Sequence, residues 1–181
     1  MLIQFSRLQS KPFYCLETKT VLGKIKDLIC DPKNGQILAF EIFTLPLSGR
    51  RFISTRDVLE TNPNYLIVAK ESCRIKAEDV LALKKIVDSG IKVLDALAKN
   101  KKGEWLGRID DLLIDSQTLS IIKFYLRGAT IGFSDKPVIS LKQNSIIPAE
   151  DLIKITLEAV IFKNQIQGTE KVKKATAPEL A

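Results

Sequence analysis

The amino-acid sequence predicts a mainly β protein in which one folding unit occurs twice. Two segments, 23–40 and 107–124, resemble each other, and in both of them short apolar runs alternate with turn-forming residues. Between the two copies, segment 76–89 spaces its apolar residues at the three- and four-residue intervals of an amphipathic helix. The chain has 181 residues, which is long enough for two small units of similar size.

The repeat appears when the chain is aligned with itself at an offset of 84 residues. A second match, between 57–59 and 151–153, follows after ten extra residues in the later copy. Two matches in the same order predict a duplicated unit of roughly 75 residues. The identical pairs in the first match are Gly23/Gly107, Ile25/Ile109, Asp27/Asp111, Leu28/Leu112, Asp31/Asp115, Ile37/Ile121 and Phe40/Phe124.

Each copy opens with a predicted β-hairpin. In the first copy Pro32 fixes φ within the turn, and the pair Asn34-Gly35 tolerates positive φ. The turn of the second copy lacks both proline and glycine and is therefore less sharply specified. The predicted segments are strand 22–30, turn 31–35 and strand 36–45 in the first copy, and strand 106–114, turn 115–118 and strand 120–127 in the second.

The later part of each copy differs in its turn residues. Asn62-Pro63-Asn64 predicts a second hairpin in the first copy, ahead of a strand at 65–70. No comparable residues interrupt segment 152–162, which predicts one longer bent strand in the second copy.

The segment that connects the copies predicts a helix at 76–89. Its apolar stripe contains Val80, Leu83, Ile86 and Val87, and Gly90 follows as the residue that ends the helix. We expect this stripe to pack on one or both units. The predicted organisation is a first unit at 1–75, a connecting helix at 76–90, a second unit at 91–166 and a disordered tail at 167–181.

The repeated motif, Gly-x-Ile-x-Asp-Leu-Ile/Leu-x-Asp followed by a turn and Ile-x-x-Phe, resembles the signature of the PRC-barrel family. That family includes the cytoplasmic domain of the photosynthetic reaction centre H subunit and the C-terminal domain of a ribosome maturation factor. The resemblance implies two tandem small antiparallel β-barrels joined by the helix, each with its own hydrophobic interior. It also implies protein–protein contacts, because no catalytic constellation is attached to the fold.

The second copy carries an insertion at 128–137 that departs from the family pattern. Apolar and polar residues alternate within it, which predicts an extra strand or a projecting β-loop. Its apolar residues Ile131 and Phe133 are candidate anchors for a protein partner. We therefore expect the two units to differ in function.

Composition excludes several classes of catalytic and metal site. The chain has no histidine, which excludes His-dependent triads, His metal sites and imidazole proton shuttles. Cys15, Cys30 and Cys73 lie far apart and are predicted to be buried, inert thiols. The glycines at 128–132 fit no phosphate-binding loop. The sequence thus predicts no catalytic residues, no metal and no cofactor, and hence no enzymatic activity.

The repeated glycines and aspartates have two possible roles. The carboxylates could act as general acids and bases or hold Mg²⁺ or Ca²⁺. Their occurrence in both copies favours a structural role, as acceptors of backbone N–H groups near bulges and turns, with the glycines entering strands at corners. These structural-motif residues are Gly23, Asp27, Asp31, Gly107, Asp111 and Asp115.

A weak nucleic-acid signal lies just before the second copy of the motif. Lys99, Lys101 and Lys102 stand beside Trp105, the only tryptophan, and lysines beside an aromatic ring suit phosphate contact and base stacking. The alternative is a solvated turn at 100–103 with Trp105 buried in the core. The net charge of +7 is spread evenly along the chain, so solubility alone also accounts for it.

Three functions remain open, and the first is favoured. It is a non-enzymatic protein-interaction or scaffold protein with an unidentified protein partner. The alternative is an RNA- or ribosome-associated factor, and the third, an accessory to an enzyme or to electron transfer, rests only on the H-subunit analogy. A cytoplasmic location is expected, because no apolar run approaches the ~20 residues of a membrane span and the start does not resemble a signal peptide.

Overall fold

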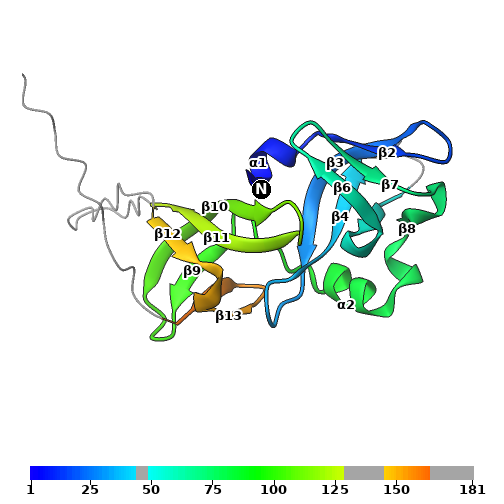
Figure 1. Cartoon of the computed structure of the whole chain (residues 1–181). Coiled ribbons are helices and arrows are strands. Elements are labelled where there is room, and N and C mark those ends of the chain that lie inside the picture. The colour runs from blue at the N-terminus through cyan, green and yellow to red at the C-terminus, as the bar shows by residue number, and fades with distance from the viewer. Residues whose placement is uncertain (44–48, 129–144, 164–181) are drawn as a thin grey trace, which may run out of the picture.

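The computed structural model describes residues 1–43, 49–128 and 145–163 (Figure 1). Two seven-stranded sheets dominate these residues, so the prediction of a mainly β fold is confirmed. The described residues also form two short α-helices, α1 (Phe5–Leu8) and α2 (Leu81–Ser89).

The first sheet contains strands from the first half of the chain, in the order β6-β7-β2-β3-β4-β5-β8. Its longest hairpin joins β3 and β4 through the predicted turn at 31–35. All pairings in this sheet are antiparallel except that of β2 with β7. The strands are β2 (Pro12–Cys15), β3 (Val21–Cys30), β4 (Ile37–Phe43), β5 (Arg51–Ser54), β6 (Val58–Asn62), β7 (Tyr65–Val68) and β8 (Arg74–Ile75).

The second sheet has the order β12-β11-β10-β9-β14-β13, which matches the order β5-β4-β3-β2-β7-β6 of the first. Its one parallel pair, β9 with β14, also corresponds to β2 with β7. The pairings found among the described residues close neither sheet, so barrel closure stays a prediction. The strands are β9 (Leu97–Asn100), β10 (Trp105–Asp115), β11 (Ser120–Arg127), β12 (Ser145–Pro148), β13 (Leu152–Ile155) and β14 (Ala159–Phe162).

The prediction of one bent strand at 152–162 is wrong, because β13 and β14 form an antiparallel hairpin. Thr156 makes the turn without proline or glycine. Its hydroxyl donates to the carbonyl oxygen of Ala159 at 2.8 Å and accepts from the N–H of Ala159 at 3.0 Å. The backbone N–H of Thr156 also donates to the carbonyl oxygen of Ala159, at 2.9 Å, so the hydroxyl reinforces the backbone bond of the turn.

The N-terminal segment joins the two sheets. Strand β1 (Leu2–Gln4) pairs with the end of β10 in the second sheet. Helix α1 follows, with Phe5 and Leu8 fully buried, and the ring of Phe5 stacks on that of Phe40 of the first sheet at 6.4 Å. One continuous hydrophobic cluster therefore contains side chains of both sheets, and the expectation of two separate interiors is wrong.

Helix α2 covers one part of the outer face of the first sheet (Figure 1). Leu83 packs there with Ile29, Ala39 and Phe52. The helix begins at Leu81 and not at 76, because Ala77–Asp79 form a 3₁₀ turn in which the Asp79 carboxylate accepts the N–H of Lys76 at 2.7 Å. Gly90 ends the helix in the left-handed conformation, at φ 69°.

Candidate functional site: the outer face of the first sheet

The aspartates of the repeated motif accept backbone hydrogen bonds at equivalent places. Asp27 and Asp111 each follow a β-bulge, and each Oδ1 accepts the N–H of the next residue at 2.8 Å. Asp31 and Asp115 lie in the hairpin turns, where they accept N–H groups two residues ahead at 2.8 and 3.2 Å. This geometry uses the carboxylates to shape the backbone.

The two motif glycines lie where the neighbouring strand approaches most closely. At Gly107 φ is +134°, and an added Cβ would lie 2.6 Å from the carbonyl oxygen of Arg127. At Gly23 an added Cβ would lie 2.7 Å from the carbonyl oxygen of Phe43. Both positions therefore need a residue without a side chain.

Asp111 differs from Asp27 in its second set of contacts. Besides its own strand, Asp111 accepts the N–H of Ser6 at 3.0 Å and the hydroxyl of Ser6 at 2.6 Å. It thereby fixes α1 to the second sheet.

Burial raises the pKa of Asp27 above its ordinary value, against the lowering effects of the Leu28 N–H and of Lys92.

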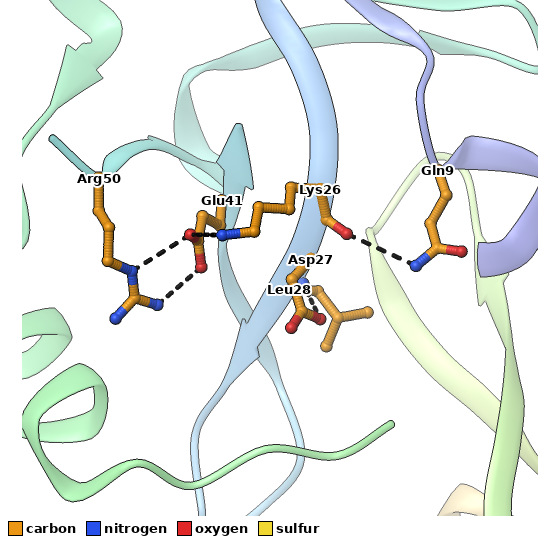
Figure 2. Close-up of polar contacts among 6 residues, drawn as sticks. All are labelled: Gln9, Lys26, Asp27, Leu28, Glu41 and Arg50. Carbon is orange, nitrogen blue, oxygen red and sulfur yellow. Dashed lines mark hydrogen bonds and ion pairs between the residues drawn. The ribbon is translucent and has the colours of Figure 1, made fainter. Parts of the chain in front are cut away.

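A cluster of charged side chains lies beside Asp27 on the outer face of the first sheet (Figure 2). Glu41 on β4 is only 4% exposed and lies between two cations. Lys26 Nζ is 2.8 Å from Glu41 Oε1, and Arg50 binds both carboxylate oxygens at 3.2 and 2.7 Å. The guanidinium of Arg50 also lies 5.3 Å from the centre of the Phe52 ring. The cluster thus orders two long cationic side chains above the sheet.

Glu41 is ionised in this cluster at neutral pH. Burial acts to raise the pKa of Glu41, but the hydrogen bonds from Arg50 and Lys26 outweigh it and hold the pKa below its ordinary value of 4.5. Hydrogen bonding to Glu41 likewise raises the pKa of Arg50. The ion pairs therefore stabilise the fold when Glu41 is ionised.

Replacing Glu41 with glutamine is expected to lower the free energy of unfolding at pH 7 by about 1–2 kcal/mol, a modest value because both cations are half exposed. The native pKa lies below the unfolded value, so this stabilisation is present above pH 4.5 and is lost as the pH falls through the native pKa. Urea unfolding of both proteins at pH 7 and at about pH 3 measures the difference. A stability gap that is the same at both pH values would contradict this assignment.

Next to the charged cluster, the outer face is open and carries aromatic rings. Tyr14 is 42% exposed and Phe43 is 54% exposed. Tyr65 is half-buried and meets Tyr14 edge to face at 5.8 Å between ring centres. Lys24 is exposed and pairs directly with Phe43 across β3 and β4, and Lys26 Nζ lies 6.0 Å from the Phe43 ring centre. Rings and cations thus share one surface over β7, β2, β3 and β4.

The equivalent surface of the second sheet has cations where the first sheet has Tyr14 and Phe43. The position of Phe43 is taken by Arg127, which forms ion pairs with Asp95 and Asp110. The position of Tyr14 is taken by Lys99, paired with Trp105. The two sheets share strand order but present different chemistry, because outward-facing side chains are free of the packing that fixes the core.

The lysines of the predicted nucleic-acid cluster lie on β9 and the turn after it. Lys99 is half-buried, whereas Lys101 and Lys102 are exposed on a turn held by Asn100, whose side-chain oxygen accepts the N–H of Lys102 at 2.9 Å. Trp105 is half-buried, not buried in the core as the alternative expected, because its neighbour Leu106 occupies the inward position of the strand. Ile131 and Phe133 lie outside the described residues.

Sequence reasoning missed Tyr14, Phe43 and Tyr65 as surface residues. The signal that could have found them is the alternation of side chains along a strand, since each ring neighbours a buried apolar residue; for Tyr14, strand β2 itself was not predicted. The pairing of Glu41 with Arg50 had no comparable signal, since it depends on the register of β4 with β5.

Among residues 1–43, 49–128 and 145–163, no group of three or more Cys, Asp or Glu side chains could hold a metal ion. Cys15 and Cys30 are buried and Cys73 is half-buried, and burial raises the pKa of the Cys30 thiol. In the same described ranges, no helix has the length and apolar content needed to span a membrane.

A scan against protein-family models and a search of curated proteins each found no match to this chain.

Proposed function

We propose that this chain is a non-enzymatic interaction or scaffold protein built from two PRC-like units, each a closed barrel, linked by α2. The duplicated Gly-x-Ile-x-Asp-Leu motif and the common strand order of the two sheets support the proposal. In both units a motif aspartate accepts a hydrogen bond from the backbone N–H of the next residue, as expected of a side chain that the fold itself requires. We place the protein in the cytoplasm.

The observation that carries an interaction role is a groove beside β6, at the edge of the first sheet. It has a volume of about 480 Å³ and lies between β6 and the turn at 116–119. Leu59, on its wall, is 61% exposed. An exposed apolar side chain on the wall of a groove is a suitable anchor for a protein partner.

The equivalent place in the second unit is closed by the chain itself. There the N–H of Ile155 on β13 donates to the carbonyl oxygen of Pro32 at 2.7 Å, and Leu152 packs against Gly35. In the described residues no backbone hydrogen bond joins β6 to the turn at 116–119. Leu119 stands in the position of Gly35, and its buried side chain prevents the same close approach. We therefore assign the open groove to a partner protein.

Photo-crosslinking tests this proposal. A photoreactive phenylalanine analogue at Leu59 is expected to capture a defined protein partner in cells, whereas the analogue at the equivalent Ile153 captures none. The substitution Leu59→Lys should abolish recovery of that partner with little effect on stability, because Leu59 is exposed. The same captured proteins at both positions, or none at Leu59, would refute the groove as the partner site.

An RNA- or ribosome-associated factor is the second candidate. The observation that favours it is the surface shared by Tyr14, Phe43 and Lys24, which is distinct from the groove beside β6.

A further inference from the structure

We propose that the open outer face of the first sheet binds single-stranded nucleic acid, with Tyr14 and Phe43 stacking on bases. Both rings are exposed, and they lie on β2 and β4, separated by β3. Neighbouring strands are about 4.8 Å apart, so the rings stand on strands about 10 Å apart. This site goes beyond the protein-binding groove proposed above.

The neighbouring cations give this face its preference for a polyanion. Lys24 lies on β3, the strand between the two rings, where it pairs with Phe43 on one side and with Pro12, two residues before Tyr14, on the other. Lys26 and Arg50 follow along the same face, with about half of each side chain exposed. The carboxylates packed with them are Glu41, which is buried beneath its cations, and Asp27, which is half-buried. The exposed charge is therefore positive.

The arrangement suits single strands better than duplexes. Aromatic side chains stack on unpaired bases whatever their sequence, while lysines follow the phosphate backbone. In a duplex the bases are already stacked on each other, so exposed rings on a sheet gain no partner. A protein partner could also cover the rings, but the flanking lysines favour the nucleic acid.

The second sheet provides an internal comparison. At the equivalent positions Lys99 replaces Tyr14 and Arg127 replaces Phe43, and Arg127 is engaged by two carboxylates. The second sheet therefore lacks the two rings on which the proposal rests, and the Lys99, Lys101 and Lys102 cluster lies outside the proposed face.

Fluorescence anisotropy with the full chain tests the proposal. The probes are a labelled ten-nucleotide oligouridylate RNA, the corresponding oligothymidylate DNA, and a duplex RNA of the same length. Binding of the single strands at low salt is expected, and either Tyr14→Ala or Phe43→Ala should weaken it by about 5- to 150-fold. Lys24→Ala should reduce the slope of log affinity against log salt by about 0.7. RNA bound more tightly than DNA would identify RNA as the ligand, and equal affinity would identify single strands in general.

The controls separate this face from other surfaces. Ile146→Ala removes an exposed apolar side chain from the second sheet and should leave affinity unchanged, as should Lys99→Ala. The ring variants should stay folded, with melting temperatures within about 5 °C of the parent, because both rings are partly exposed and neither belongs to the hydrophobic core. No binding at low salt, unchanged affinity in both ring variants, tighter binding to the duplex, or loss of binding with Lys99→Ala alone would overturn the proposal. A photoreactive group at Tyr14 that captures only protein would also overturn it, and none of these results bears on the Leu59 groove.

Discussion

Replacing Gly107 with alanine is expected to destabilise the protein by about 3–5 kcal/mol, the largest effect foreseen for a single methyl group. The new Cβ would lie 2.6 Å from the carbonyl oxygen of Arg127, and the backbone at φ +134° is strained for any residue with a side chain. The atom that the new methyl group meets belongs to the backbone of β11, so no flexible side chain can move aside. Equilibrium unfolding in urea measures the loss.

Gly103→Ala is the matched control for this prediction. Gly103 also has a positive φ, of +82°, but an added Cβ there would meet nothing within 4 Å. This variant should lose about 1 kcal/mol of its free energy of unfolding, from backbone strain alone. Similar losses at Gly103 and Gly107 would show that close approach of β10 to β11 is not the reason for the glycine.

Replacing Asp111 with alanine is expected to destabilise the protein by about 2–4 kcal/mol, because three hydrogen bonds to the carboxylate are lost and the buried N–H of Leu112 is left without its partner. Residues 1–8 should then detach from the second sheet more readily. Urea unfolding gives the stability, and amide hydrogen exchange over residues 1–8 gives the local effect.

Asp27→Ala is the matched control for Asp111. Asp27 has the same bulge and the same bond to the following N–H, but no described contact to a segment equivalent to α1. Its raised pKa means that ionised Asp27 costs stability above that pKa, so removing it offsets the lost hydrogen bond. The expected change at pH 7 is within about 1 kcal/mol. Equal losses at both aspartates would show that the Ser6 contact contributes nothing.

The different surroundings of Asp27 and Asp111 also bear on function. In the second sheet the N-terminal segment pairs with β10 and meets the motif aspartate. In the first sheet the motif aspartate lies beside the Lys26, Glu41 and Arg50 cluster, and the neighbouring Tyr14 and Phe43 are exposed. The two units share their strand order but differ in these surroundings. The nucleic-acid proposal concerns the outer face of the first sheet.

The local structure was largely predictable from the chain. Alternating residues with a proline–glycine turn predict the β3–β4 hairpin, and the repeat transfers that prediction to β10 and β11. Turns made by side-chain hydroxyls are harder to predict from sequence. The turn at Thr156 was not predicted, because threonine is also a common strand residue. The helix start at Leu81 depended on the cap formed by Asp79 and could be predicted only to within a few residues.

The mainly β class, the main hairpins and the glycine and aspartate positions of the motif can be predicted from the chain alone, because they follow from residue properties over a few neighbours. Three features emerge only from the folded arrangement: β1 and α1 join the second sheet, Glu41 lies between Lys26 and Arg50, and Tyr14 and Phe43 are exposed on one face. Most of these contacts join residues that are distant along the chain. Their formation depends on strand register and on which surfaces remain uncovered after the core has packed.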